Sequence, residues 1–156
     1  MTGDQFRWLL VTVTVLRGLS SGTITGLLMM IPVRRRIGLL PYAQATRALY
    51  KGQGVRVYAA VTILGVLLTV VVTVIAFMQG KPVALTSTAT ISCVASSMGL
   101  VGTARNFPIM QKLWVTTDDD ETRVASLLAI WERWHIVGAG SHVAAFIALV
   151  VALAYA

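Results

Sequence analysis

Residues 55–82 read VRVYAAVTILGVLLTVVVTVIAFMQGKP, and this stretch decides the fold. It is rich in valine and holds no charged residue between Arg56 and Lys81. At about 1.5 Å of rise per residue, a helix over residues 55–78 is long enough to cross a hydrocarbon core of about 30 Å. The tight turn at residues 79–82 then predicts that the following helix returns antiparallel beside this one.

Three further apolar segments predict membrane-spanning helices over residues 8–33, 83–104 and 134–155. Hydrophobic residues make up 56% of the 156 residues and charged residues 12%, which favours one small membrane domain over several soluble domains. The expected fold is therefore all-α: a single domain, residues 1–156, folded as an integral membrane four-helix bundle. Asp4 and Arg17 do not fit a cleaved signal peptide, so the first segment is expected to belong to the bundle.

Shorter segments lie outside the four spans. Residues 41–51 alternate apolar and polar side chains at helical spacing, which predicts a short helix in the membrane interface. Pro108 is expected to end the third helix, because proline cannot continue the backbone hydrogen-bond ladder. A lead-in helix is predicted over residues 119–133, and Asp118 with Glu121 has the spacing of a capping box at its start.

The formal net charge of +7 gathers beside the apolar spans, which is typical of a membrane protein, and we expect no nucleic-acid partner. The connection between the first two spans is strongly basic, whereas the next turn holds only Lys81. The positive-inside rule therefore predicts a multi-pass protein, expected in a bacterial cytoplasmic membrane, with both long connections in the cytoplasm and both termini outside. The basic residues of that connection are Arg34, Arg35, Arg36, Arg47, Lys51 and Arg56.

Gly18, Gly22 and Gly26 recur at four-residue spacing in the first helix, so another helix can approach its backbone closely. The third helix, rich in serine, threonine and glycine, is the predicted partner. Cys93 is the only cysteine, which excludes an intramolecular disulfide and the dithiol chemistry of small four-helix quinone or vitamin K epoxide reductases.

The candidate site centres on residues 131–142, WERWHIVGAGSH, which hold both histidines. At about 100° per residue, Trp131, His135, Gly138 and His142 share one helix face, with Trp134 at its edge. An aromatic stripe bearing two imidazoles therefore enters the membrane at a gap left by a small residue.

The depths of the polar residues predict how they meet. Arg17 lies roughly 13 Å from the outer end of the first helix, and His142 roughly 12 Å from the cytoplasmic end of the fourth. In a core of about 30 Å, the two can meet near the middle of the bilayer. His135 falls at the level of Asn106 and the two tryptophans. This describes a funnel with an aromatic mouth and a basic floor, suited to a flat apolar molecule from the membrane.

Two segments resemble the anthrone oxygenase-like family of small four-helix membrane proteins. They are residues 105–110, RNFPIM, and residues 131–135, WERWH. The family typically shows Asn-x-Pro-x-Asn and Trp-x-x-Trp-Asn/His there. Met110 stands where the second asparagine is expected, and Gly138 near an expected arginine. The resemblance implies a monooxygenase of natural-product biosynthesis that oxidises anthrone-type polyketides with O2 and needs no metal or flavin.

By this resemblance Asn106, Trp131, Trp134 and His135 are candidate site residues. In the resulting hypothesis, neutral His135 takes a proton from an acidic carbon or a phenol. Asn106 and Arg17 then stabilise the oxyanion in a dry site. His142 is added as a catalytic candidate, and Phe107 joins the two tryptophans as a substrate-binding candidate. The simpler interpretation is an interfacial histidine among tryptophans that anchor the chain in the membrane.

Two alternatives remain open. A terpene cyclase would use the acidic cluster at residues 118–121 to hold magnesium or to protonate its substrate, although a helix cap also explains such a cluster. A non-catalytic helical membrane subunit needs no special residues. Metal or haem binding by Glu132 and His135 lacks enough further ligands, so no metal and no cofactor are expected. The expected partners are the lipid bilayer and a lipophilic small molecule, with a homo-oligomer left open.

Overall fold

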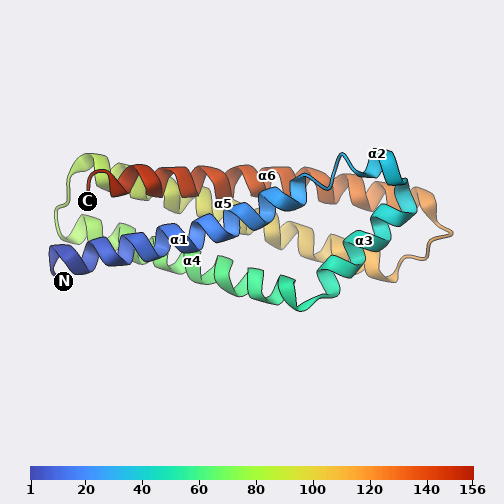
Figure 1. The fold of residues 1–156 in the computed structure, drawn as a ribbon, viewed down its shortest axis with the longest axis horizontal. Helices are drawn as coiled ribbons and strands as arrows, with labels where there is room; N and C mark the ends of the chain where they lie inside the picture. Colours follow the sequence, from blue (N-terminus) through green and yellow to red (C-terminus); the bar gives the residue numbers. More distant parts are fainter.

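In the computed structural model, which describes residues 1–156, nearly the whole chain is helical. The four long helices lie side by side in one elongated bundle, with both termini at the same end (Figure 1). Each is long and apolar enough to cross a membrane, so the chain is an integral multi-pass membrane protein. The all-α fold predicted from the sequence is thus confirmed. The elements are α1 (Gly3–Leu28), α2 (Arg34–Ile37), α3 (Leu39–Lys51), α4 (Gln53–Met78), α5 (Val83–Val115) and α6 (Glu121–Leu153).

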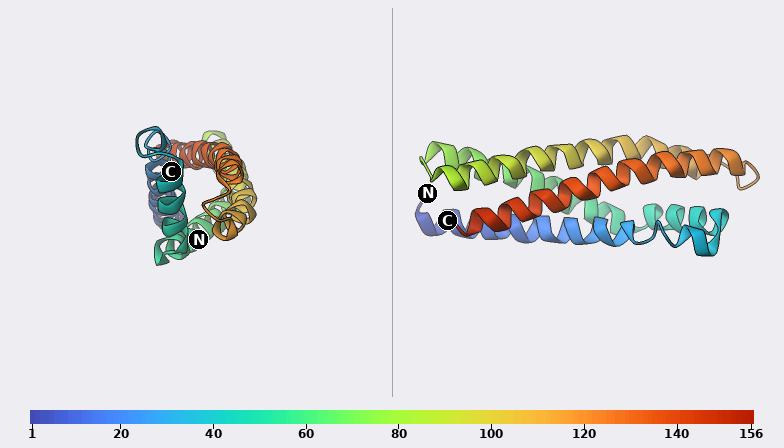
Figure 2. Two further views of the ribbon diagram at one scale, coloured as in Figure 1. Left: turned by 90° about the vertical axis from the view of Figure 1, so that its right-hand side faces the viewer. Right: turned by 90° about the horizontal axis from the view of Figure 1, so that it is seen from above.

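The long helices form a ring in the order α1, α6, α5 and α4, as the end-on view in Figure 2 shows. α1 packs against α4 and α6, and its backbone does not come close to that of α5, so the predicted close packing of the first helix on the third is wrong. The reason is that α6 takes the place beside α1. Gly18 accommodates the ring of Phe146 from α6, whereas Gly22 and Gly26 are exposed and face open space.

The charged residues mark the level of the membrane. None occurs in residues 57–80, 82–104 or 134–156, and Arg17 is the only one in residues 8–33. α5 and α6 each continue beyond these limits, by roughly 17 Å and 20 Å. We therefore expect both helices to extend beyond the hydrocarbon core, at the end opposite the termini.

Pro108 does not end the third helix as predicted. It lies inside α5, which continues to Val115. Proline removes one hydrogen bond of the ladder, but the turns that follow bury Met110 and Leu113 against α6 and α3, and this packing holds the helix together. The fourth span and its lead-in likewise form one unbroken helix, α6.

The extensions of α5 and α6 join α2 and α3 in a small helical unit, which we call the head (residues 34–52 and 106–133). α3 is a helix, as predicted, and its buried face packs on α5 and α6, because Tyr42 and Ala43 belong to the apolar core of the head. Its location in the membrane interface stays a prediction. That core comprises Tyr42, Ala43, Met110, Leu113, Val124, Leu127, Leu128 and Trp131.

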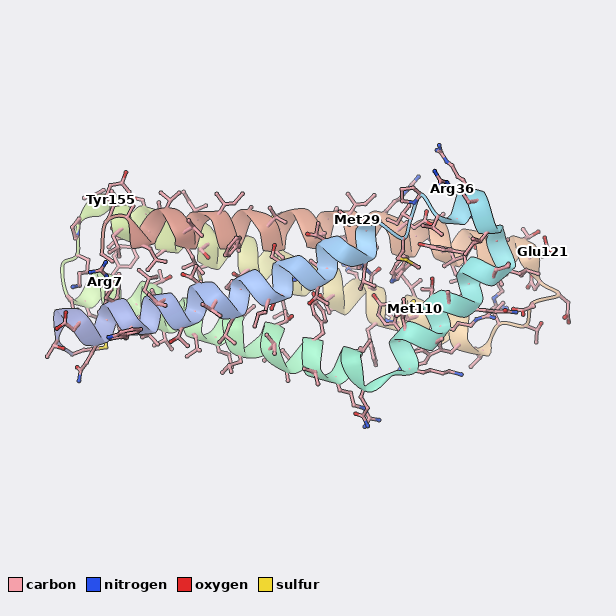
Figure 3. The ribbon with its side chains drawn as sticks, viewed as in Figure 1. Arg7, Met29, Arg36, Met110, Glu121 and Tyr155 are labelled. Atoms are coloured by element: carbon pink, nitrogen blue, oxygen red, sulfur yellow. The ribbon has the colours of Figure 1, made fainter.

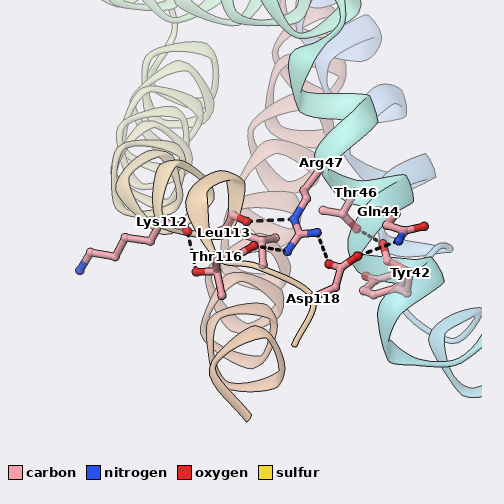
Figure 4. A network of polar contacts seen from close by, with 8 residues as sticks. All are labelled: Tyr42, Gln44, Thr46, Arg47, Lys112, Leu113, Thr116 and Asp118. Atoms are coloured by element: carbon pink, nitrogen blue, oxygen red, sulfur yellow. Dashed lines mark hydrogen bonds and ion pairs between the residues drawn. The ribbon is translucent and has the colours of Figure 1, made fainter. Parts of the chain in front are cut away.

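An arginine clamp fastens α3 to the link between α5 and α6 (Figure 4). Arg47 donates hydrogen bonds to the carbonyls of Leu113 and Thr116, both at 2.9 Å, and to Asp118 at 2.6 Å. Gln44 donates to the other Asp118 oxygen at 2.8 Å. The hydrogen bond from Arg47 lowers the pKa of the Asp118 carboxyl below its ordinary value.

Asp118 is therefore not the helix cap that the sequence predicted. Asp120 caps α6, accepting a hydrogen bond from the backbone N–H of Arg123 at 3.1 Å. Glu121 lies in the first turn of α6, where a carboxylate favours the positive end of the helix dipole. The three acidic residues thus have separate positions, and only the general placement of the cluster at a helix start was predicted.

Candidate active site

A cavity of about 610 Å³ opens between the helices where the membrane part meets the head. Toward the membrane it is lined by Ile24, Gly102 and Gly138, and toward the head by Met110 and Trp114. Figure 3 marks Met110 beside the junction of α3 and α4. The wall of the cavity is largely apolar, and Lys51 and Arg56 lie at its aqueous side.

His135 contributes a titratable group to this cavity. Its side chain is 3% exposed and stacks on Trp131, with ring centroids 4.6 Å apart and planes inclined by 21°. The His135 Nε2 atom has no hydrogen-bond partner. The indole N–H of Trp131 donates to the Tyr50 hydroxyl at 3.2 Å, which fixes the ring that supports the imidazole. An oriented imidazole with a free nitrogen beside an apolar cavity can accept a proton from a bound molecule.

Asn106 holds α6 at the position of this histidine. With its amide oriented to satisfy both groups, Asn106 donates to the Trp131 carbonyl and accepts from the backbone N–H of His135, each at 3.3 Å. The Asn106 side chain thus spans one rung of the α6 backbone ladder from the neighbouring helix. This contact fixes the position of His135 along the axis of α6 relative to α5. The Asn106 side chain also lines the cavity.

Arg17 and His142 meet in the middle of the membrane part, as their depths predicted. Arg17 Nη2 lies 2.9 Å from His142 Nδ1, and both side chains are 0% exposed. A guanidinium only donates, so Nδ1 accepts and the hydrogen of this neutral imidazole is on Nε2. Gly99 makes room for the ring, since a Cβ atom there would stand 3.0 Å from it. Neither residue lines the cavity, and His142 is one helical turn below Gly138.

The structure brings the other predicted residues together only in part. Asn106, Phe107, Trp134 and His135 line the cavity, and Phe107 is 59% exposed and so stands at its rim. Trp131 is 2% exposed and lies behind His135, where it supports the imidazole and does not face the cavity.

Two tyrosines were missed by the sequence analysis. Tyr50 and Tyr58 line the cavity from the two sides of the α3–α4 junction, and the Tyr58 hydroxyl is buried without a hydrogen-bond partner. Burial raises the pKa of Tyr50 to about 12, so its hydroxyl stays protonated at neutral pH. The sequence feature that could have indicated these tyrosines is their position on either side of Gly52 and Gly54, where the chain turns back into the membrane.

The acidic cluster is not at the cavity. Asp118 binds Arg47 and Gln44, and Asp120 caps α6. Glu132 pairs with Arg34 at 3.1 Å and does not approach His135 as a joint ligand. No group of three or more His, Cys, Asp or Glu side chains is arranged to hold a metal ion. The family models, the curated proteins and the solved structures that were compared with this chain give no match.

Proposed function

We propose that this protein is a membrane-embedded enzyme that takes a flat, lipophilic aromatic molecule into the cavity and oxidises it with O2. One observation carries the proposal: a buried imidazole with a free ring nitrogen lines a largely apolar cavity at the membrane boundary. Ligand cavities typically measure about 300–1,000 Å³, so 610 Å³ accommodates a molecule of three fused rings. The proposed membrane is a bacterial cytoplasmic membrane.

The rim supports entry from the lipid. Phe107 lines the cavity while 59% of its surface is exposed, so an apolar molecule can pass from the bilayer along this side chain. Trp134 lines the same wall, with the guanidinium of Arg105 over its ring at 5.8 Å. This arrangement suits a ligand with an aromatic face.

The chemistry follows from the groups at the wall. For His135 to act as the base, its hydrogen must be on Nδ1, so that Nε2 accepts a proton from the ring CH2 of an anthrone or from a phenol. The resulting anion is electron-rich and is oxidised by O2. For an anthrone, the CH2 becomes C=O, one oxygen atom enters the product, and the other leaves as water with both hydrogens. A dry wall keeps the anion from being quenched by solvent.

The terpene cyclase alternative has weaker support. Asp118 is engaged in the arginine clamp, Asp120 caps α6, and the acidic cluster does not line the cavity.

The non-catalytic alternative is distinguished from the enzyme by experiment. Purified protein in detergent is mixed with anthrone in air, and O2 uptake and anthraquinone absorbance are recorded. The His135→Ala variant is expected to lower turnover by about 10²–10⁴-fold, the usual contribution of a general base.

Ile136→Ala is the matched control, since Ile136 is the next residue on α6 and is 53% exposed. It is expected to retain full turnover. Quenching of tryptophan fluorescence by anthrone reports binding separately from reaction. Binding without turnover in the wild-type protein favours the non-catalytic role. Turnover that survives in His135→Ala but is lost when Asp118, Asp119 and Asp120 are all changed to Asn favours the cyclase-type site.

A further inference from the structure

Arg17 is a buried charge without a carboxylate partner. Its side chain is 0% exposed at the middle of the membrane part. Asp4 lies at the start of α1, and the other five acidic residues of the chain belong to the head. A guanidinium keeps its proton under all ordinary conditions, so the charge cannot be removed by deprotonation. Burying it in a low-dielectric region is unfavourable unless a negative charge lies nearby.

The side chains around Arg17 supply hydrogen-bond donors but no anion. Arg17 Nε and Nη1 have no partner, and neither does Nε2 of His142, which carries the hydrogen of that ring. The Ser96 hydroxyl is 0% exposed and also has no partner. Ser96 lies on α5 about one helical turn before Gly99, which packs against the His142 ring. Four buried donor atoms on α1, α5 and α6 are therefore unsatisfied, and we call the region of Arg17, Ser96 and His142 the polar layer. Unpartnered buried polar groups of this number require an explanation.

The layer is closed on one side and leads to the cavity on the other. Toward the termini, Val13, Val72 and Leu149 belong to a fully buried apolar core. Toward the head, Gly138 lines the cavity one helical turn above His142. Tyr58 also lines the cavity, and its buried hydroxyl has no hydrogen-bond partner. The cavity is therefore the nearest open space to the layer.

We propose that Arg17, His142 and Ser96 form a binding site for a single negatively charged group, one helical turn beyond the cavity on the side of the termini. Unsatisfied donors around one uncompensated positive charge are the groups that bind a halide or an oxyanion. Two sources share this chemistry: a free chloride ion, and the acidic end of the lipophilic ligand. The second source rests on the proposed function; the first does not.

The free-ion source is tested by thermal unfolding. Protein purified in a nonionic detergent is equilibrated in sodium gluconate, and gluconate is replaced by chloride or bromide at constant ionic strength while tryptophan fluorescence gives Tm. Gluconate, a much larger anion than chloride, serves as the reference. If chloride occupies the site, Tm rises by a few degrees for each tenfold increase in chloride above the dissociation constant.

The ligand source is tested by mass spectrometry of molecules that co-purify with the protein. If the acidic end of a ligand occupies the site, a lipophilic acid is found with the wild-type protein and is lost from Arg17→Met. His135→Ala removes the proposed base but none of the donors of the polar layer, so it is expected to retain the chloride response. The chloride measurement is therefore decided independently of anthrone turnover.

Arg17→Met is expected to abolish the chloride response, and its Tm in gluconate is expected to equal or exceed that of the wild type, because an uncompensated buried charge has been removed. Arg7→Met is the matched control, an exposed arginine on the same helix, and is expected to retain the response. A chloride-independent Tm together with no co-purified acid overturns the proposal, as does a chloride response that persists in Arg17→Met. If Arg17→Met does not fold, the chloride titration and the mass spectrum of the wild-type protein still show whether it binds an anion, and a negative result in both overturns the proposal.

Discussion

Gly102 of α5 lies directly against Gly138 of α6: a Cβ atom added to Gly102 would stand 3.2 Å from the Gly138 Cα and 3.3 Å from the Trp134 carbonyl oxygen. Both contacts are with backbone atoms, which cannot move aside as a flexible side chain can. Both glycines also line the cavity. The approach of α5 to α6 and the shape of the cavity wall therefore depend on the same pair of residues.

Replacing Gly102 with alanine is expected to force α5 and α6 apart. Overpacking of this kind typically destabilises a protein by about 1–3 kcal/mol, which exceeds the gain of about 1 kcal/mol from the better helix propensity of alanine. A lower Tm and weaker anthrone quenching of tryptophan fluorescence are the expected results. Gly22→Ala is the control, since nothing lies within 4 Å of its added Cβ, and its Tm should not fall. Equal Tm values for both variants would contradict the close approach.

Asn106→Ala is expected to loosen the α6 backbone at His135 without unfolding the bundle. Asn106 acts on the reaction through His135, so turnover should fall by about 10–10²-fold, less than in His135→Ala. Hydrogen exchange at residues 131–135 should become faster, a change independent of activity. Thr103→Ala is the control one turn earlier on α5, because its hydroxyl donates to the Gly99 carbonyl of its own helix. Unchanged exchange at residues 131–135 would exclude the positioning role.

Asp118→Asn is expected to lower the stability of the head in a pH-dependent way. Because Arg47 lowers the pKa of Asp118, the ion pair stabilises the folded state above the ordinary carboxyl pKa of 3.8, and this stabilisation is lost as pH falls through the lowered value. Tm of the variant should therefore be below that of the wild type at pH 7 and should match it in strong acid. Asp119→Asn, at an exposed residue outside the clamp, should leave Tm unchanged at both pH values. A difference that persists in acid would argue against the ion pair.

The orientation of the bundle is tested by labelling single cysteines with a membrane-impermeant maleimide in a Cys93→Ala background. The head carries eight of the thirteen basic residues, and Arg56 and Arg105 border it, so the positive-inside rule places the head in the cytoplasm. A cysteine at Lys81 is expected to react in intact cells, and a cysteine at Arg35 only after permeabilisation. The opposite pattern would reverse the topology.

The membrane part was predictable because the apolar spans are long and free of charge. The number of spans and the depth match of Arg17 and His142 follow from residue counts along straight helices, and both were found. The order of the helices around the ring was not predictable. The four-residue glycine spacing in α1 indicates that a helix can approach, but not which one, and only Gly18 is used.

The head and the cavity lining depend on tertiary contacts that no local pattern reveals. Pro108 predicts a helix end, yet packing of the following turns on α6 outweighs one missing hydrogen bond. Asp118 has capping-box spacing but binds Arg47, a residue 71 positions earlier in the chain. Trp131 shares a helix face with His135, and the stacking of the two rings turns the indole away from the cavity.

The two apolar cores have no residue in common, and the polar layer and the cavity lie between them. We therefore expect the head and the membrane part to unfold in separate steps. Urea acts on the head, whose core lies outside the bilayer, while the other core is shielded by lipid and keeps its backbone hydrogen bonds satisfied within each helix. The head is thus expected to be the less stable unit, and a single free energy of unfolding would then not describe the whole chain.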